Sequence, residues 1–217
     1  MAIRGVSSTQ NIAEEATSGI QFFDNILTTG IRSGKIPARE TSARKWYRDT
    51  AKSFSKSSIS DTKIMKQGGD RLTARPLVGS MYMFYYDAKH KATLPYFDRF
   101  PLIFPYKKVK GGFMGINMHY LPLQYRAKLM DSLYDVASNT KYDESTRLKI
   151  NYKILSGASQ FRYFKPCVKH YLTSQVRSRF LYVYPSEWDI ALFMPLERFE
   201  GATKTQVYAD SRKIIRG

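Results

Sequence analysis

Between residues 79 and 122 the hydrophobic positions fall into short, aromatic-rich runs that Pro, Gly and Lys repeatedly interrupt. Short apolar runs bounded by turn residues are typical of β-strands rather than of long helices. The pattern predicts three strands, at residues 80–86, 99–106 and 113–118, with turns at residues 87–90 and 110–112. Because proline has no N–H to donate to a ladder, edge or bulged positions are expected at Pro95, Pro101 and Pro105.

After Pro122 the hydrophobic spacing changes to three and four residues, which is the period of an amphipathic helix. This spacing predicts three helices, which begin at Pro122, Asp143 and Lys165. The second should end near Gly157, and the third should carry an apolar face of Cys167, Val168, Tyr171 and Leu172. A short strand is predicted at residues 180–184, followed by a helical turn that contains Trp188.

The first 76 residues have few large hydrophobic side chains and are rich in Ser, Thr, Gly and basic residues. Two short helices are predicted there, at residues 12–27 and 38–54. In the second of them, basic side chains surround a thin apolar stripe, and a helix of this kind is unstable in isolation. We therefore expect an arm that becomes ordered against a partner or along the main domain.

Together these elements predict an α+β fold, in which a small antiparallel sheet is followed by helices and preceded by an extended, partly helical basic arm. The expected domains are the N-terminal arm at residues 1–76, a compact α+β domain at 77–200 and a basic C-terminal tail at 201–217. A chain of 217 residues, 43% of them hydrophobic, is large enough to bury a core of its own.

Net charge narrows the choice of partners. The chain has 35 Lys and Arg against 18 Asp and Glu, a net charge of +17, which favours polyanions. No apolar run approaches the ~20 residues of a transmembrane helix, and the first ten residues lack the apolar core of a secretion signal. No membrane partner is therefore expected, and nucleic acid or an acidic protein surface remains. A single cysteine, Cys167, excludes an internal disulfide and suggests a reducing compartment.

Basic residues concentrate in residues 145–186, which contain no Asp or Glu and in which aromatic residues are interleaved. Lys and Arg neutralise phosphates, and exposed aromatic rings can stack on unpaired bases. An ordinary solvated face is the alternative for the cations, and most of the aromatic rings are expected in the core. The predicted DNA contacts are Arg162, Lys165, Lys169, Arg177 and Arg179, with Arg44, Lys45 and Arg48 from the arm and Lys107, Lys108 and Lys110 from the aromatic segment.

No catalytic, cofactor or metal site is predicted. His90, His119 and His170 are far apart, and Cys167 with His170 on one helix face would supply two ligands, too few for a zinc site. A nuclease is the catalytic alternative, because Asp87-Ala88-Lys89 follows a strand and Asp98 or Asp70 could join it. Metal-dependent nucleases need clustered carboxylates, and this tripeptide is common in basic proteins, so we expect no enzyme.

Several long strings carry a resemblance to a known family. MYMFYYDAKHKATLPYFDRFPLIFP is followed by GGFMGINMHYLP and RAKLMDSLYD, and later by SGASQFRYFKPCVKHYLTSQVRSRF and PSEWDIALFMPLERF. Over residues 78–199 the chain resembles the DNA end protector protein family of T-even-type tailed bacteriophages. The resemblance implies a non-catalytic virion structural protein that binds the ends of packaged double-stranded DNA and shields them from exonuclease. It implies no roles for individual residues.

A second hypothesis stays open on the same residues. An architectural protein of the phage neck, tail or baseplate could dock its basic arm on neighbouring virion proteins without touching DNA. Both hypotheses place the chain in the virion, with other virion proteins as partners, and both are compatible with a homo-oligomer in the particle.

Overall fold

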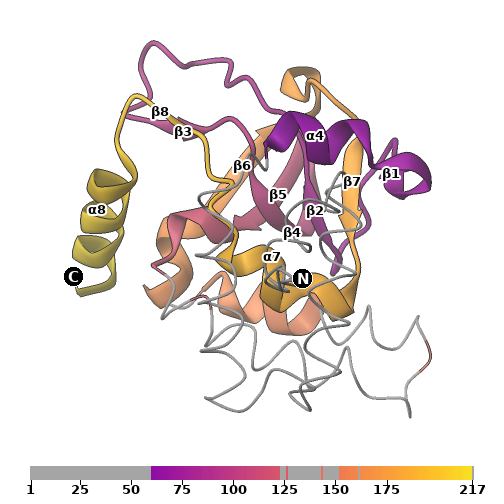
Figure 1. Cartoon of the computed structure of the whole chain (residues 1–217). Coiled ribbons are helices and arrows are strands. Elements are labelled where there is room, and N and C mark those ends of the chain that lie inside the picture. Colours follow the sequence, from indigo (N-terminus) through magenta and orange to yellow (C-terminus); the bar gives the residue numbers. More distant parts are fainter. Residues whose placement is uncertain (1–59, 123–125, 127–142, 144–151, 161, 217) are drawn as a thin grey trace, which may run out of the picture.

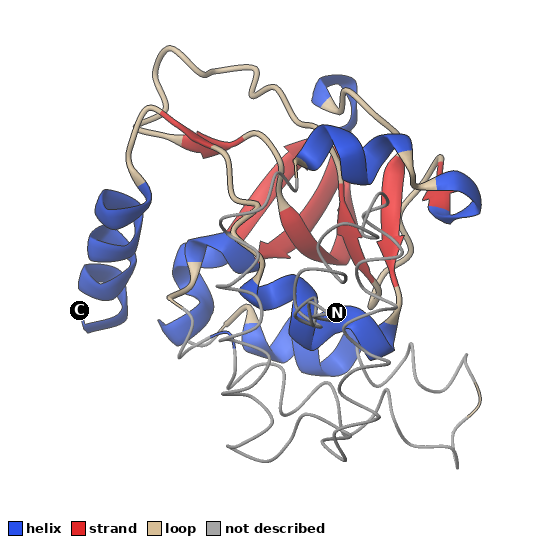
Figure 2. Ribbon diagram, in the orientation of Figure 1, coloured by secondary structure: helices blue, strands red, loops and turns tan. Residues whose placement is uncertain are grey.

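The computed structural model describes residues 60–122, 126, 143, 152–160 and 162–216. Figures 1 and 2 show the strands at the centre of this part of the chain, with helical segments around them and α8 (Lys204–Arg216) at one side. The two predicted arm helices, with Arg44, Lys45 and Arg48, lie outside the described residues, as does most of the helix predicted after Pro122.

Six strands form one sheet in the order β1-β7-β2-β4-β5-β6, and each pairing is antiparallel. The strands are β1 Leu72–Thr73, β2 Met81–Met83, β4 Leu102–Val109, β5 Gly112–Asn117, β6 Val168–Leu172 and β7 Phe180–Val183. A separate ladder pairs β3 Phe97–Asp98 with β8 Phe199–Glu200. The α+β prediction is confirmed, and so are the four predicted strands, with their ends shifted by a few residues.

The described helices are short apart from α8. They are α4 Asp61–Lys66, α7 Trp188–Phe193 and residues 152–158, with 3₁₀ turns η1 Gly69–Arg71, η2 Met118–Tyr120, η3 Arg162–Cys167, η4 Thr173–Gln175 and η5 Pro185–Glu187. The predicted helical turn at Trp188 is confirmed as η5 and α7, and the predicted helix end near Gly157 lies at residue 158. Within the described ranges no helix is long and apolar enough to cross a membrane.

The helix predicted from Lys165 is wrong beyond Cys167. There the chain forms β6, which pairs with β5 so that Lys169 lies opposite Gly115. A segment of five residues such as Val168–Leu172 is too short for its hydrophobic pattern to distinguish a helix from a strand, and here the edge of β5 supplies backbone partners that decide for the strand. As a result Cys167 is buried while His170 is exposed, and the two do not share a helix face.

Of the three prolines predicted at edge or bulged positions, Pro105 lies at a bulge, although in a central strand. β4 lies between β2 and β5, and its register with β5 shifts between Pro105 and Lys107. Such a bulge leaves one residue without a ladder partner, and this allows proline inside a central strand. Pro101 directly precedes β4, and Pro95 lies in the connection before β3.

The two faces of the sheet carry different cores. Side chains alternate along β2, so Tyr82 and Phe84 pack on one face and Met81 and Met83 on the other. The first face is an aromatic cluster around Phe84, whose ring centroid lies 4.8 Å from that of Phe180. The larger core on the second face includes Trp188, Ile64 of α4 and Val207 of α8. Most aromatic residues of the segment 79–122 are therefore core, as expected; the division into arm, domain and tail stays a prediction.

Two buried arginines tie distant segments together. The guanidinium of Arg71 donates two hydrogen bonds of 2.8 Å to Glu187, which fastens η1 to η5. Arg126 is only 1% exposed and donates to three backbone carbonyls and one phenol rather than to a carboxylate. Its acceptors are the carbonyl oxygens of Leu121 (2.7 Å), Leu192 (2.5 Å) and His119 (3.2 Å) and the hydroxyl of Tyr208 (2.6 Å).

Candidate nucleic-acid interface

Three of the predicted DNA contacts lie together at the β4–β5 hairpin end. Lys107 and Lys108 are the exposed positions near the end of β4, and Lys110 is exposed in the turn that follows. Gly111 closes this turn at a φ of 75°, a conformation that glycine adopts without strain. The hairpin therefore presents three cations at one end of the sheet.

Arg177 and Arg179 lie in the connection between η4 and β7, and both are exposed. The N–H of Thr173, at the start of η4, donates to the carbonyl oxygen of Gly111 at 2.9 Å. This bond places η4 beside the lysine-bearing hairpin turn, although the two are far apart in the sequence. Arg177 is partly neutralised, because its guanidinium lies 3.6 Å from a carboxylate oxygen of Asp87.

The remaining predicted contacts differ in exposure. Arg162 begins η3, and Lys165 is exposed in the same element. Lys169, by contrast, is partly buried on β6, with its ammonium 3.9 Å from the centroid of the Tyr120 ring. Burial lowers the pKa of Lys169. Lys169 is therefore a cation held in a cavity wall rather than on an open face.

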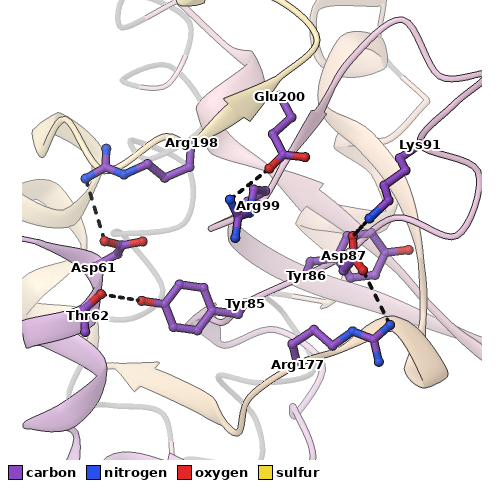
Figure 3. Close-up of a pocket in the computed structure, with 10 residues that line it drawn as sticks. All are labelled: Asp61, Thr62, Tyr85, Tyr86, Asp87, Lys91, Arg99, Arg177, Arg198 and Glu200. Carbon is purple, nitrogen blue, oxygen red and sulfur yellow. Dashed lines mark hydrogen bonds and ion pairs between the residues drawn. The ribbon is translucent and has the colours of Figure 1, made fainter.

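A large charged pocket lies beside this region (Figure 3). Its volume is about 910 Å³, and it is lined by four cations and three carboxylates. Each cation is already paired: Lys91 (2.9 Å) and Arg177 (3.6 Å) with Asp87, Arg99 with Glu200 (2.9 Å), and Arg198 with Asp61 (3.9 Å). A phosphate entering this pocket would have to displace a carboxylate, so the pocket offers little net attraction for nucleic acid.

The arrangement of carboxylates does not support the nuclease hypothesis. The pKa of Asp87 lies below its ordinary value, chiefly because Lys91 donates a hydrogen bond to it. Lys89 lines a different cavity from Asp87, so the tripeptide does not converge on one site. No group of three or more metal-binding side chains occurs within the described part of the chain. The two or more carboxylates required near Lys89 are not assembled there.

That second cavity, of about 340 Å³, lies between β6 and the segment 86–98. Its basic groups are Lys89, His90, Lys169 and His170, and four tyrosines, three of them buried, are also among its lining residues. Sequence reasoning predicted only Lys169 of this set, because it assigned residues 168–172 to a helix. A strand assignment would have placed Lys169 and His170 at a sheet edge, but no spacing signal brings Lys89 beside them.

Asp98 is the one carboxylate among the residues lining this cavity, and it is 2% exposed and fully engaged. Its oxygens accept from His119 Nδ1 at 2.7 Å and, at 3.1 Å each, from the side chain of Asn117 and the N–H groups of Phe100 and Arg198. Burial alone would raise the pKa of Asp98, but His119 and the other donors outweigh it, so this pKa lies below its ordinary value.

His119 is neutral in this arrangement. Burial lowers its pKa, and the attraction of Asp98 offsets that only in part. The neutral ring donates its Nδ1–H to Asp98, and Nε2, which has no hydrogen-bond partner among the described residues, is then a lone pair rather than a buried N–H. The cavity is thus bordered by a satisfied ion–dipole network and not by a free carboxylate.

We expect stability to fall on acidification because of this pair. Both folded-state pKa values are lowered, so the unfolded chain takes up protons first, at His119 from about pH 6.5 and at Asp98 near pH 3.9. The free energy of unfolding should therefore decrease as the pH falls below about 6.5, by up to about 1.4 kcal/mol per pH unit while His119 alone contributes. Thermal melts followed by circular dichroism from pH 8 to 4 would measure the slope.

A matched pair of variants isolates the cause of this pH dependence. His119→Gln should flatten the slope between pH 7 and 5, whereas the exposed His90→Gln should retain it. A wild-type melting temperature that is constant between pH 7 and 5 would contradict the assignment.

Comparison with known proteins agrees with the resemblance seen in the sequence. Over residues 4–216 the sequence matches the family described as phage T4 terminal DNA protecting protein. Neither the curated proteins nor the solved structures provide a match. The family match extends beyond the strings that suggested it and includes the arm residues Arg44, Lys45 and Arg48 as well as the C-terminal helix. Since it covers nearly the whole length, the chain belongs to the phage T4 terminal DNA protecting protein family.

Proposed function

We propose that this protein binds the ends of packaged phage DNA without catalysis and shields them from exonucleases. The observation that carries the proposal is the match of nearly the whole chain to a family named for protecting terminal DNA. The net charge of +17 supports it, because a cationic protein releases counterions when it neutralises phosphates. The separation of Asp87 from Lys89 supports the non-catalytic part.

Protection in this proposal is electrostatic and steric. Lys107, Lys108, Lys110 and Arg179 are exposed and have no ion-pair partner among the described residues, so their charge is available to phosphates. Protein bound over a terminus occupies the space that the first nucleotides need to reach an exonuclease site. The proposed contacts are Arg162, Lys165, Lys169, Arg177, Arg179, Lys107, Lys108 and Lys110, together with Arg44, Lys45 and Arg48 from the arm.

We further infer a location in the virion, since a protein that guards packaged DNA has to travel with that DNA. Neighbouring virion proteins are the second class of partner in this proposal, and a homo-oligomer in the particle is compatible with it. Imaging of assembled particles with an antibody or tag on this chain would test the location, and detection only in the infected cell would contradict it.

Removal of the hairpin cations tests the interface. In the triple variant Lys107→Ala/Lys108→Ala/Lys110→Ala, the affinity for linear duplex should fall at least tenfold at low salt, and the salt slope should decrease by about three counterions. Exonuclease should also digest the bound duplex faster. Fluorescence anisotropy between 50 and 200 mM salt, with a parallel digestion assay, would measure both effects.

The matched control removes the same charge elsewhere, through Lys66→Ala/Arg75→Ala/Arg216→Ala, all exposed positions outside the hairpin. If both triple variants behaved alike, the hairpin would not be a specific contact. If the wild-type chain left linear DNA as exposed to exonuclease as no protein at all, the proposed function itself would be wrong.

A further inference from the structure

The ammonium of Lys169 has no anionic partner in the described chain. Charged groups that are withdrawn from water are normally paired. Lys169 instead lies on the face of the Tyr120 ring, at 3.9 Å, and none of the described ion pairs includes it. The nearby carboxylate of Asp98 is occupied by four donors of its own. Among the described residues, the Lys169 ammonium therefore has no anion that compensates for its partial burial.

The surrounding groups would suit an anion. Lys89, His90 and His170 line the same cavity and are exposed, so each can approach a bound group. The backbone adds a donor, because β6 is the last strand of the sheet that the described residues form. The N–H of Leu172 points outward to the hydroxyl of Tyr86 (3.3 Å), and by the alternation of an antiparallel edge strand the N–H of His170 points outward too.

The size of the cavity restricts which ligands can enter it. A volume of about 340 Å³ lies at the lower end of ligand cavities and corresponds to an edge of about 7 Å, whereas the major groove of duplex DNA alone is about 12 Å wide. One nucleotide fits such a space, but an uninterrupted duplex does not. The end of a DNA strand, or a free nucleotide, is therefore the form of DNA that fits inside this cavity.

We propose that this cavity binds the terminal phosphate of a DNA strand, with the last nucleotide against the partly exposed ring of Tyr96. The inference rests on the proposed function and specifies how an end is distinguished from internal DNA. A terminal phosphate monoester carries between one and a half and two negative charges near neutral pH, roughly twice the charge of an internal diester. Its three free oxygens can bind Lys169, Lys89 and the N–H of His170 together.

The burial of Lys169 fits this assignment. Desolvation lowers its pKa in the free protein, and a doubly charged phosphate beside it would oppose that effect. A neutral or apolar ligand would leave the ammonium without compensation. Among the described residues that line this cavity, Tyr96 is the one tyrosine that is not buried, and its ring can contact a terminal base without selecting one, as end protection of a genome requires.

Binding of the full-length chain to three DNA forms would test the proposal: blunt duplexes with a 5′-phosphate, the same duplexes with a 5′-hydroxyl, and closed circles. Wild type should prefer the phosphorylated end by about tenfold, the value of one charge-assisted contact. Lys169→Met keeps the apolar part of the side chain and should reduce the ratio of affinities for phosphorylated and hydroxyl ends to near one. Lys66→Met, an equal charge change at an exposed position of α4, should leave this affinity ratio unchanged.

Thermal melts would show whether Lys169→Met remains folded. Exposed Lys89→Ala provides a second variant with little effect on packing, and it should lower the ratio several-fold. A terminal phosphate could come from a DNA end or from a free nucleotide, and competition with thymidine 5′-monophosphate distinguishes the two. Displacement of phosphorylated duplex by the monophosphate, but not by thymidine, would support a terminal-phosphate site.

Three results would overturn the inference. Equal affinity of wild type for phosphorylated and hydroxyl ends would do so while leaving the proposed function intact, provided linear DNA is still bound and protected. Binding of the monophosphate through Lys169 without any preference for phosphorylated duplex would make the cavity a free-nucleotide site instead. Failure to bind linear DNA in preference to circles would remove both the inference and the proposed function.

Discussion

Replacing Arg126 by methionine should destabilise the protein by about 3–5 kcal/mol, the largest single effect we expect. The guanidinium satisfies the carbonyls of His119, Leu121 and Leu192 at a point where none of them can reach water. A methionine fills similar space but donates nothing, so three buried acceptors and the Tyr208 hydroxyl lose their partner. Urea denaturation followed by circular dichroism would measure the loss.

Two further substitutions test whether the lost hydrogen bonds of Arg126 cause the destabilisation. Arg126→Lys keeps the charge but replaces the planar fork with a single ammonium, so it should recover only part of the lost stability. Arg75→Met, at an exposed position, should change stability by less than about 0.5 kcal/mol. A small effect of Arg126→Met, comparable to that of Arg75→Met, would show that the carbonyls find other donors.

Gly112→Ala should cost about 3 kcal/mol, the upper end of the usual overpacking range. A Cβ at this position would lie 2.0 Å from the backbone carbonyl oxygen of Tyr171, so β6 itself would have to move away from β5. Since Lys169 and His170 are on β6, the preference for a phosphorylated DNA end should weaken together with stability. Denaturation and the end-binding assay would measure the two effects on the same sample.

Gly157→Ala is the matched control for this substitution. Nothing lies within 4 Å of a Cβ at Gly157, which is helical, so alanine should stabilise the protein by about 0.5–1 kcal/mol. If Gly112→Ala left stability and the preference for phosphorylated ends unchanged, this would contradict the close approach of β6 to β5 at Gly112.

The spacing of hydrophobic residues and the positions of turn residues were enough to predict most of the sheet from the sequence. Alternation and β-propensity located β2, β4, β5 and β7, and Pro105 indicated the bulge in β4. The same reasoning failed at β6, because a run of five residues has no period long enough to exclude a helix. Its conformation is decided by the free edge of β5, which is a tertiary feature.

Prediction of the site was less complete for a related reason. Charge and exposure are properties of single residues, so Lys107, Lys108, Lys110 and Arg179 could be proposed without a fold. The cavity around Lys169 depends on how β6 packs against the segment 86–98. Neither Lys89 nor Tyr120 has a sequence spacing that indicates contact with Lys169, and the burial of Arg126 is equally invisible in a chain so rich in cations.

The position of β7 has a consequence for how the chain is made in the cell. β7 lies between β1 and β2, pairing Leu181 with Leu72 and with Met83. β1 is therefore joined to the rest of the sheet by a strand that is synthesised about a hundred residues after β2, and such non-local pairing folds slowly. Until the ribosome has released β7, the β2 edge is unpaired. The sheet can thus be completed only after β7 has been synthesised, and a ribosome that stalls before β7 leaves an exposed strand edge open to aggregation.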